Sequence, residues 1–173
     1  MNKQTMRSVR QQAQQGFTLI ELIVVIVILG ILAATALPKF ADLGSSARKA
    51  SLNAALGAVN ATVSMTHGQS LVNPAGPIVN EGVTVTMVNG YPSGSTNVAN
   101  TILAMGISGN DFTINSTSGA AATGTAPAVP TNGFTLVPAS VAGTAAAVTC
   151  FVSYAQSTGT NIAPVVSMTN SGC

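Results

Sequence analysis

Tryptophan is absent from this 173-residue sequence, aromatic residues make up 4% of it and charged residues only 6%. Ordinary soluble domains carry roughly 25% charged residues. Such sparse charge excludes the strongly basic face with which proteins neutralise nucleic-acid phosphates. We therefore expect a neutral surface on which Ser, Thr and Asn side chains form hydrogen bonds in place of ion pairs, and no nucleic-acid partner.

Basic residues are concentrated at the start of the chain, where Lys3, Arg7 and Arg10 all precede Gly16. The formal net charge of the full sequence is +2. Without residues 1–16, three basic and four acidic side chains remain, which is a balance of −1. The part of the chain after Gly16 is therefore close to neutral.

Residues that could form a catalytic, metal-binding or phosphate-binding site are equally scarce. His67 is the only histidine, which excludes metal motifs that need a pair of histidines. The four acids are spread from Glu21 to Asp111 without the spacing of a catalytic pair, and the glycines follow no phosphate-loop pattern. The sequence predicts no enzyme, no cofactor and no metal site.

Only two cysteines occur, Cys150 and Cys173, too far apart in sequence for a CxxC redox site or a zinc knuckle. Two cysteines are too few for a disulfide-framework miniprotein. The simple interpretation is one disulfide that holds the last residues and forms outside the cytoplasm. Two free thiols in a reducing compartment remain the alternative.

An apolar run extends from Phe17 to Leu37, and Glu21 is its only charged residue. A helix of this length measures roughly 30 Å, which matches the hydrocarbon core of a bilayer. The run predicts either a membrane span or a fully buried core helix. An ordinary secretory signal is a further alternative, with residues 22–33 as its apolar part and cleavage after Ala36.

The stretch at residues 16–21, Gly-Phe-Thr-Leu-Ile-Glu, resembles the processing motif of type IV pilins and of type II secretion pseudopilins. The basic leader, the unbroken apolar run and its closing Pro38 support the resemblance. It implies that a prepilin peptidase removes residues 1–16 after Gly16 and methylates the amine of Phe17. It also implies a single-pass inner-membrane protein with a cytoplasmic N-terminus, which later becomes part of an extracellular filament.

The resemblance gives Glu21 a role in assembly. In a bundle of identical helices, its carboxylate would pair with the amine of Phe17 in a neighbour displaced axially by roughly 6 Å. Near the end of a span, Glu21 could instead extend to the membrane surface. Gly30 and Pro38 predict a flexible stretch, since both residue types weaken a helix.

Beyond Pro38 the helical pattern continues to His67-Gly68, which suits a helix end. It presents two apolar faces, and the sequence does not say which of them packs on the chain's own sheet. One face is Leu52, Leu56, Val59 and Val63; the other is Phe40, Leu43, Ala47, Ala50, Ala54, Ala58, Ala61 and Met65.

Residues 68–173 predict a β domain. The expected strands are residues 83–88, 112–115, 133–137, 145–155 and 164–169, with a short helix at 97–105 and a surface excursion at 116–132. We expect an α+β fold, in which the helix 17–67 packs on an antiparallel sheet of about four strands. In type IV pilins a disulfide closes a loop near the C-terminus, which here implies Cys150–Cys173 and the loop 150–173.

The family implies a structural function: the major subunit, type IVa-like, of a type IV pilus that polymerises into a helical filament for adhesion and biofilm formation. Implied partners are further copies of the chain, the prepilin peptidase, the inner-membrane assembly platform with its ATPase, and a glycan or other surface receptor. A pseudopilin of a type II secretion system is the alternative. Major pseudopilins usually lack this disulfide and often carry calcium-binding carboxylates, whereas no acid follows Asp111 here.

Overall fold

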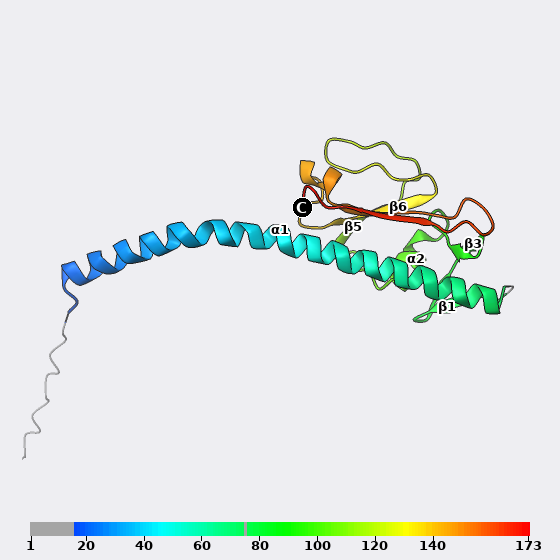
Figure 1. Ribbon diagram of the computed structural model, residues 1–173, viewed down its shortest axis with the longest axis horizontal. Coiled ribbons are helices and arrows are strands. Elements are labelled where there is room, and N and C mark those ends of the chain that lie inside the picture. The colour runs from blue at the N-terminus through cyan, green and yellow to red at the C-terminus, as the bar shows by residue number, and fades with distance from the viewer. Residues whose placement is uncertain (1–15, 75) are drawn as a thin grey trace, which may run out of the picture. The chain divides into compact units, whose positions relative to one another are not determined.

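The structure, a computed structural model, describes residues 16–74 and 76–173 (Figure 1). Residues 1–15, nearly all of the expected leader, lie outside the described part. The chain divides into two compact units, Met1–Asp42 and Leu43–Cys173, here called the N-terminal and C-terminal units. The helices and strands are α1 (Leu19–Val72), β1 (Ile78–Asn80), β2 (Val83–Val85), β3 (Met87–Val88), β4 (Tyr91–Pro92), α2 (Val98–Ala104), β5 (Phe112–Asn115), β6 (Gly133–Pro138), a 3-10 helix η1 (Ala145–Thr149), β7 (Phe151–Ala155) and β8 (Val165–Thr169).

The fold class is the expected one: α+β, with a long N-terminal helix followed by antiparallel sheets. The largest sheet has four strands in the order β5-β6-β7-β8, and each neighbouring pair is antiparallel. In the register, Phe134 lies opposite Tyr154, and Val152 lies opposite both Leu136 and Met168. Every residue of β6 is buried, because this inner strand is covered on both faces of the sheet.

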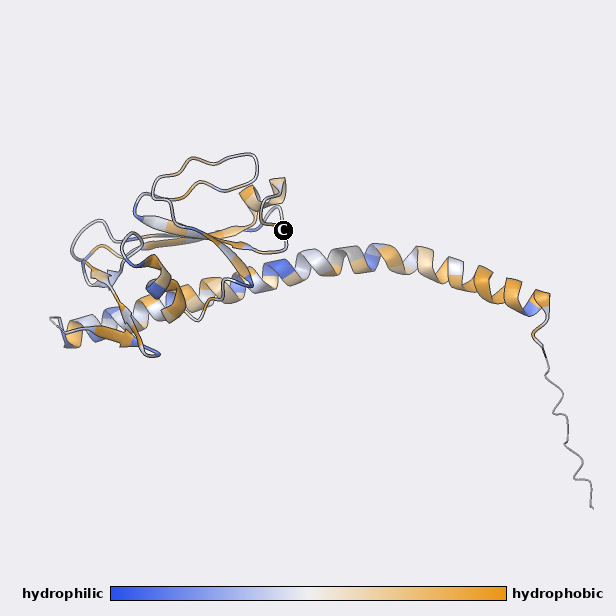
Figure 2. Cartoon of the chain, turned by 180° about the vertical axis from the view of Figure 1, so that it is seen from behind, coloured by the Kyte–Doolittle hydropathy of each residue, from blue (hydrophilic) through white to orange (hydrophobic). Residues whose placement is uncertain are grey.

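In the N-terminal unit, the first part of α1 consists almost wholly of large apolar residues (Figure 2). Their side chains are exposed along the whole run from Leu19 to Leu37. Within the described residues, α1 is the one helix long and apolar enough to cross a membrane, judged by length and composition. Pro38 lies inside α1, and the helix continues on both sides of it.

In the C-terminal unit, α1 packs with the sheet around one hydrophobic core. Leu52, Val59 and Val63 of the helix are buried, together with Phe134 and Tyr154 of the sheet. The face that contains Leu52 is therefore the one that meets the chain's own sheet. The other face leaves these side chains exposed: Leu43, Ala47, Ala50, Ala54, Ala61 and Met65.

Tyr154 shows how polar groups are accommodated in this core. Its ring stacks on Phe134, with ring centroids 5.1 Å apart. Its hydroxyl donates a hydrogen bond to the carbonyl of Pro92, and burial raises the pKa of Tyr154 above its ordinary value. The hydroxyl therefore stays protonated and joins β7 to β4.

The helix does not end where the sequence suggests. It continues past His67-Gly68 to Val72, and the amide of Asn73 still donates to the carbonyl of Gln69. Pro74 sets the end, because it restricts the backbone of the preceding residue. His67 is not a helix cap: its Nδ1 lies 2.8 Å from the carbonyl oxygen of Gly90, to which it donates a hydrogen bond.

Two strand expectations are also corrected. The expected strand 83–88 is divided at Thr86, so that β2 pairs with β1 while β3 pairs with β4. The carbonyl of Thr86 accepts a hydrogen bond from the amide of Ser93, which continues the pairing of β3 with β4, so the chain changes partner between Val85 and Thr86. In the expected strand 145–155, the first half is the 3-10 helix η1, because its small Ala residues favour compact turns over the pleated sheet.

Cys150 and Cys173 form a disulfide, which confirms the expected pairing and lies in the core of the C-terminal unit. Two hydrogen bonds hold the same segment. The Nε of Arg48 on α1 donates to the carbonyl oxygen of Cys173 over 2.8 Å. The amide of Gly172 donates to the carbonyl of Thr149. The last residues are thus attached to η1, to β7 and to the helix.

Removing the disulfide should destabilise the C-terminal unit. Cys173→Ser is expected to lower the free energy of unfolding by roughly 3 kcal/mol, because the bond closes a loop with a sequence separation of 23. Urea unfolding of the full chain in detergent micelles measures the change. A reductant should lower the stability of the wild type to that of the variant and leave the variant unchanged. Equal stability of wild type and variant would contradict the role of the bond.

Candidate functional site

The candidate site is the first turn of α1, where the expected processing motif meets the apolar run. Thr18 directly precedes the first helical residue, Leu19, and is therefore the N-cap. The amide of Thr18 donates to Oε2 of Glu21 over 2.8 Å, and its hydroxyl donates to the same oxygen over 2.7 Å. In return, the amide of Glu21 donates to the hydroxyl oxygen of Thr18 over 3.3 Å.

This reciprocal arrangement is a capping box, which satisfies backbone donors that the first helical turn leaves without partners. It also fixes the position of the only charge in the apolar run. All three hydrogen bonds involve Oε2 or the amide of Glu21, and within the described residues Oε1 has no hydrogen-bond partner. The carboxylate is thus held at the start of the helix with one oxygen available.

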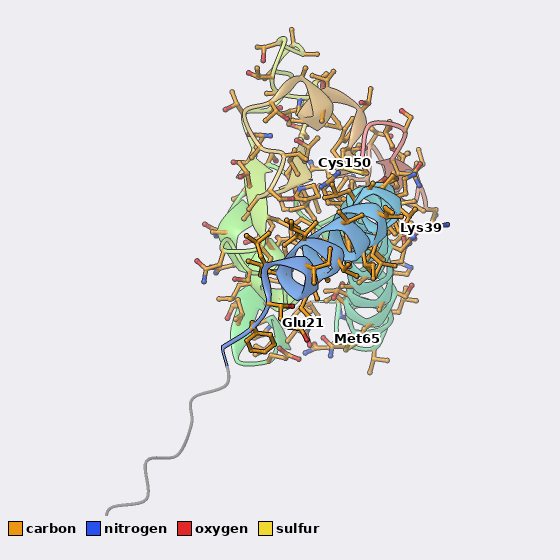
Figure 3. The ribbon with its side chains drawn as sticks, turned by 90° about the vertical axis from the view of Figure 1, so that its left-hand side faces the viewer. Glu21, Lys39, Met65 and Cys150 are labelled. Atoms are coloured by element: carbon orange, nitrogen blue, oxygen red, sulfur yellow. A yellow bond between two sulfur atoms is a disulfide. The ribbon has the colours of Figure 1, made fainter. Side chains whose placement is uncertain are left out.

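The residues around Glu21 are apolar and exposed. Figure 3 shows Glu21 at the start of α1. An open hollow of about 410 Å³ is lined by Glu21 together with Phe17, Ile20, Val24 and Val25. The Phe17 side chain is 93% exposed. The structure therefore brings Phe17 and Glu21 to the same end of the helix, where both are accessible to something outside the chain.

Gly30 and Pro38 also lie within α1. A Cβ atom at Gly30 would meet no atom within 4 Å, so packing inside the chain does not require glycine there. Gly in a helix interior costs roughly 1 kcal/mol relative to Ala. No contact within the described residues therefore explains a glycine at this position.

Sequence reasoning singled out Glu21 and missed Thr18. The signal was available, since Thr-Leu-Ile-Glu before an apolar run is the S/T-x-x-E pattern of a capping box. No group of three His, Cys, Asp or Glu side chains that could hold a metal occurs in the part of the chain that the structure describes. His67, the single histidine, stacks on the ring of Tyr91 at a centroid distance of 4.0 Å.

Loss of the capping hydroxyl should loosen the first turn. Thr18→Val is expected to accelerate hydrogen exchange of the Glu21 amide about fivefold, since this cap is worth about 1 kcal/mol. Amide exchange of the full chain in lipid micelles measures the effect. Thr35→Val is the matched control, because the hydroxyl of Thr35 donates only to the carbonyl of Leu32. An equal response of the Glu21 amide to both changes would refute the capping role.

Comparison with known proteins locates a motif at this site. The sequence model of the prokaryotic N-terminal methylation motif matches residues 11–37. The chain is also 47% identical over 45 residues to the type IV narrow pilus major component PilA5 of Thermus thermophilus. That match covers 26% of this chain and 39% of the relative, which is less than half of either protein. No solved structure matches the chain. The amino-terminal segment thus carries a prokaryotic N-terminal methylation motif, and the chain is similar over 45 residues to a type IV pilus major component.

Proposed function

We propose that this chain is the major structural subunit of a type IV pilus, with residues 1–16 as leader, 17–67 as the assembly helix and 68–173 as the outer β domain. The observation that carries the proposal is the exposed apolar segment Leu19–Leu37 of α1, which has one carboxylate held at its start and lies within a methylation motif. Within the described residues, every large apolar side chain of this segment is exposed. A bilayer and then other copies of the same helix are the surroundings that suit it.

Processing prepares the helix for assembly. A prepilin peptidase cuts after Gly16 on the cytoplasmic side and methylates the new amine of Phe17. The amine is positive at neutral pH, and the Glu21 carboxylate lies one helical turn away. The capping box supports the next step, because it holds Glu21 through one oxygen and leaves Oε1 accessible. The site therefore offers an unpaired acceptor to an incoming cation.

In the filament, Glu21 of one copy pairs with the amine of Phe17 in the next. A charge inside an apolar bundle is costly unless it is paired, so a misaligned neighbour is penalised. Pairing requires an axial displacement of about 6 Å, the rise between these two positions. The ion pair thus fixes the register of neighbouring helices, much as one buried polar residue does in a coiled coil.

Assembly transfers the apolar segment 17–37 from lipid to the filament interior. Lipid tails and packed side chains are about equally apolar, so the transfer itself provides little hydrophobic driving force. We therefore propose that an inner-membrane platform and its ATPase supply the energy that moves this segment out of the bilayer. Gly30 and Pro38 mark the stretch that loosens as the helix leaves the bilayer, where a weaker helix costs less to bend.

We further propose that the filament acts outside the cell in adhesion. Residues 85–92, Val-Thr-Met-Val-Asn-Gly-Tyr-Pro, together with the low charge, resemble the major pilin of the mannose-sensitive haemagglutinin. These residues comprise the last residue of β2, Thr86, β3, its turn and β4. The resemblance supports adhesion to surfaces or host cells and biofilm formation, with a glycan or another surface receptor as partner.

A pseudopilin of a type II secretion system would share the same leader and helix. The disulfide Cys150–Cys173 favours the pilin, as does the absence of any acid after Asp111 that could bind calcium. The pilin and the pseudopilin differ in whether cells carry long surface fibres made of this chain.

Mass spectrometry of the purified native protein tests the processing. We expect N-methylated Phe17 at its start, because the peptidase cuts after Gly16 and modifies the amine it exposes. A chain that starts at Leu37 would overturn the proposal in favour of a secreted domain. Electron microscopy of fibres sheared from cells should show filaments that contain this chain; methylated protein without fibres would favour the pseudopilin.

The register role predicts a separation of processing from assembly. Glu21→Ala should be cleaved and methylated normally, yet its yield of sheared fibres should fall at least about tenfold, because the neighbouring amine loses its partner. Glu81→Ala is the matched control, since Glu81 belongs to the C-terminal unit. Fibre yields are measured by immunoblot of sheared fractions. A Glu21→Ala strain with normal fibres would show that the carboxylate merely extends to the membrane surface.

A further inference from the structure

The C-terminal unit contains only four formal charges: Arg48, Lys49, Glu81 and Asp111. Within the described residues, no ion pair or side-chain hydrogen bond involves Lys49, Glu81 or Asp111, and all three side chains are exposed. Arg48 is half-buried, and its Nε donates to the carbonyl of Cys173. Three isolated charges on an otherwise neutral surface are therefore available to a partner.

An open groove of about 740 Å³ lies beside α1 in this unit. One wall is helical and the other consists of the loops at residues 106–111 and 138–140. The helical wall presents small side chains: Gly44, Ala47, Ser51, Ala54 and Ala58. Polar groups of Ser108, Asn110 and Asp111 contribute to the opposite wall. Small residues on one side and hydrogen-bonding groups on the other allow another polypeptide surface to approach closely.

Asp111 is held firmly at this groove. Its amide donates to the carbonyl of Ser108, and its own carbonyl accepts from the amide of Ala139. The next residue, Phe112, is buried in the core and begins β5. The loop therefore presents the Asp111 carboxylate from a backbone that is fixed on both sides.

Lys49 lies on the other side of the helix from the groove. At about 100° per residue, Lys49 is roughly 140–180° around the axis from the small residues of the helical wall. It belongs to a polar strip with Ser46, Asn53 and Asn60, all of which are exposed. Lys49 and the groove share the same stretch of helix, so their positions along its axis coincide. One copy cannot bring its own polar strip into its own groove, whereas an adjacent copy can.

We propose that the polar strip of one copy docks against the groove of a second copy, where the Lys49 ammonium pairs with the Asp111 carboxylate. Opposite charges are presented on opposite flanks of the C-terminal unit, which is the complementarity that a repeated lateral contact requires. Arg48 also lines the groove, but its hydrogen bond to Cys173 directs it toward the disulfide segment.

This contact joins two different surfaces, so it is heterologous and leaves each new copy with one surface free to bind the next. It deepens the proposed function, since it assigns to the C-terminal unit a contact between subunits of the filament. Isolated surface ion pairs are weak, but the pair repeats at every subunit. The helix core supplies cohesion, and the Lys49–Asp111 contact selects which flanks meet.

Zero-length crosslinking of sheared fibres with a carbodiimide tests the contact directly, because this reagent joins an amine and a carboxylate only when they touch. We expect a dimer band on denaturing gels whose crosslinked peptide joins Lys49 to Asp111. The Lys49–Asp111 peptide should disappear in Lys49→Gln and in Asp111→Asn, whereas a product that joins the Phe17 amine to Glu21 should persist in both variants. A Lys49–Glu81 crosslink, or fibres without a Lys49–Asp111 product, would overturn the proposal.

Charge exchange provides a second readout. Lys49→Asp and Asp111→Lys should each lower the fibre yield at least about threefold, because each places like charges at the contact. The double variant should recover most of the wild-type yield, whereas Lys49→Asp combined with Glu81→Lys should not. The contact is refuted if Lys49→Asp combined with Asp111→Lys does not recover the fibre yield, or if Lys49→Asp combined with Glu81→Lys recovers it equally well. Normal wild-type fibres in that case leave the proposed function intact, whereas absence of wild-type fibres counts against the function itself.

Discussion

The apolar side chains between Leu19 and Leu37 must be kept from water, and no residue that the structure describes does so. Fully burying one such side chain is worth roughly 1.5–3 kcal/mol, and more than a dozen of them are exposed here. A helix of this kind requires a bilayer or a set of partners. The capped turn at Thr18 and Glu21 fixes the only charge of this run at the start of the helix.

The second half of α1 packs against the chain's own sheet. Leu52, Val59 and Val63 fill the core against the sheet, so the helix is fixed within the C-terminal unit by its own tertiary contacts. Outside that stripe most of its side chains are small or polar, although Leu43 and Met65 are also exposed. The same helix therefore packs internally on one face and leaves its flanks available, as the groove beside Ala47 and the strip around Lys49 illustrate.

Sequence periodicity correctly predicted the helices and strands that contain large side chains. The α+β class and the strands near residues 112–115, 133–137 and 164–169 were correct, because β-branched and aromatic residues there alternate or cluster as a buried sheet requires. It failed where the outcome depends on partners outside the segment itself. Residues 83–88 divide because β2 pairs with β1 and β3 pairs with β4, and His67 binds the carbonyl of Gly90 instead of capping its own helix.

At the candidate site, the residues could be named from the sequence but their mutual geometry could not. Glu21 stood out because a charge in an apolar run is costly, whereas Thr18 was missed because a capping residue shows no anomaly of composition. The groove beside Asp111 could not be foreseen either. It arises from two loops and a helix that are separated by tens of residues in the sequence, and their meeting is set by the sheet between them.

The scarcity of ionic groups on the C-terminal unit has a consequence for crowding. The two positive and two negative side chains of this unit cancel, so its side chains carry no formal net charge with His67 neutral. Two such units therefore exert little Coulomb force on one another at long range, and dissolved ions have little to screen. Many units can therefore be brought side by side with little electrostatic work, in fresh or saline water alike.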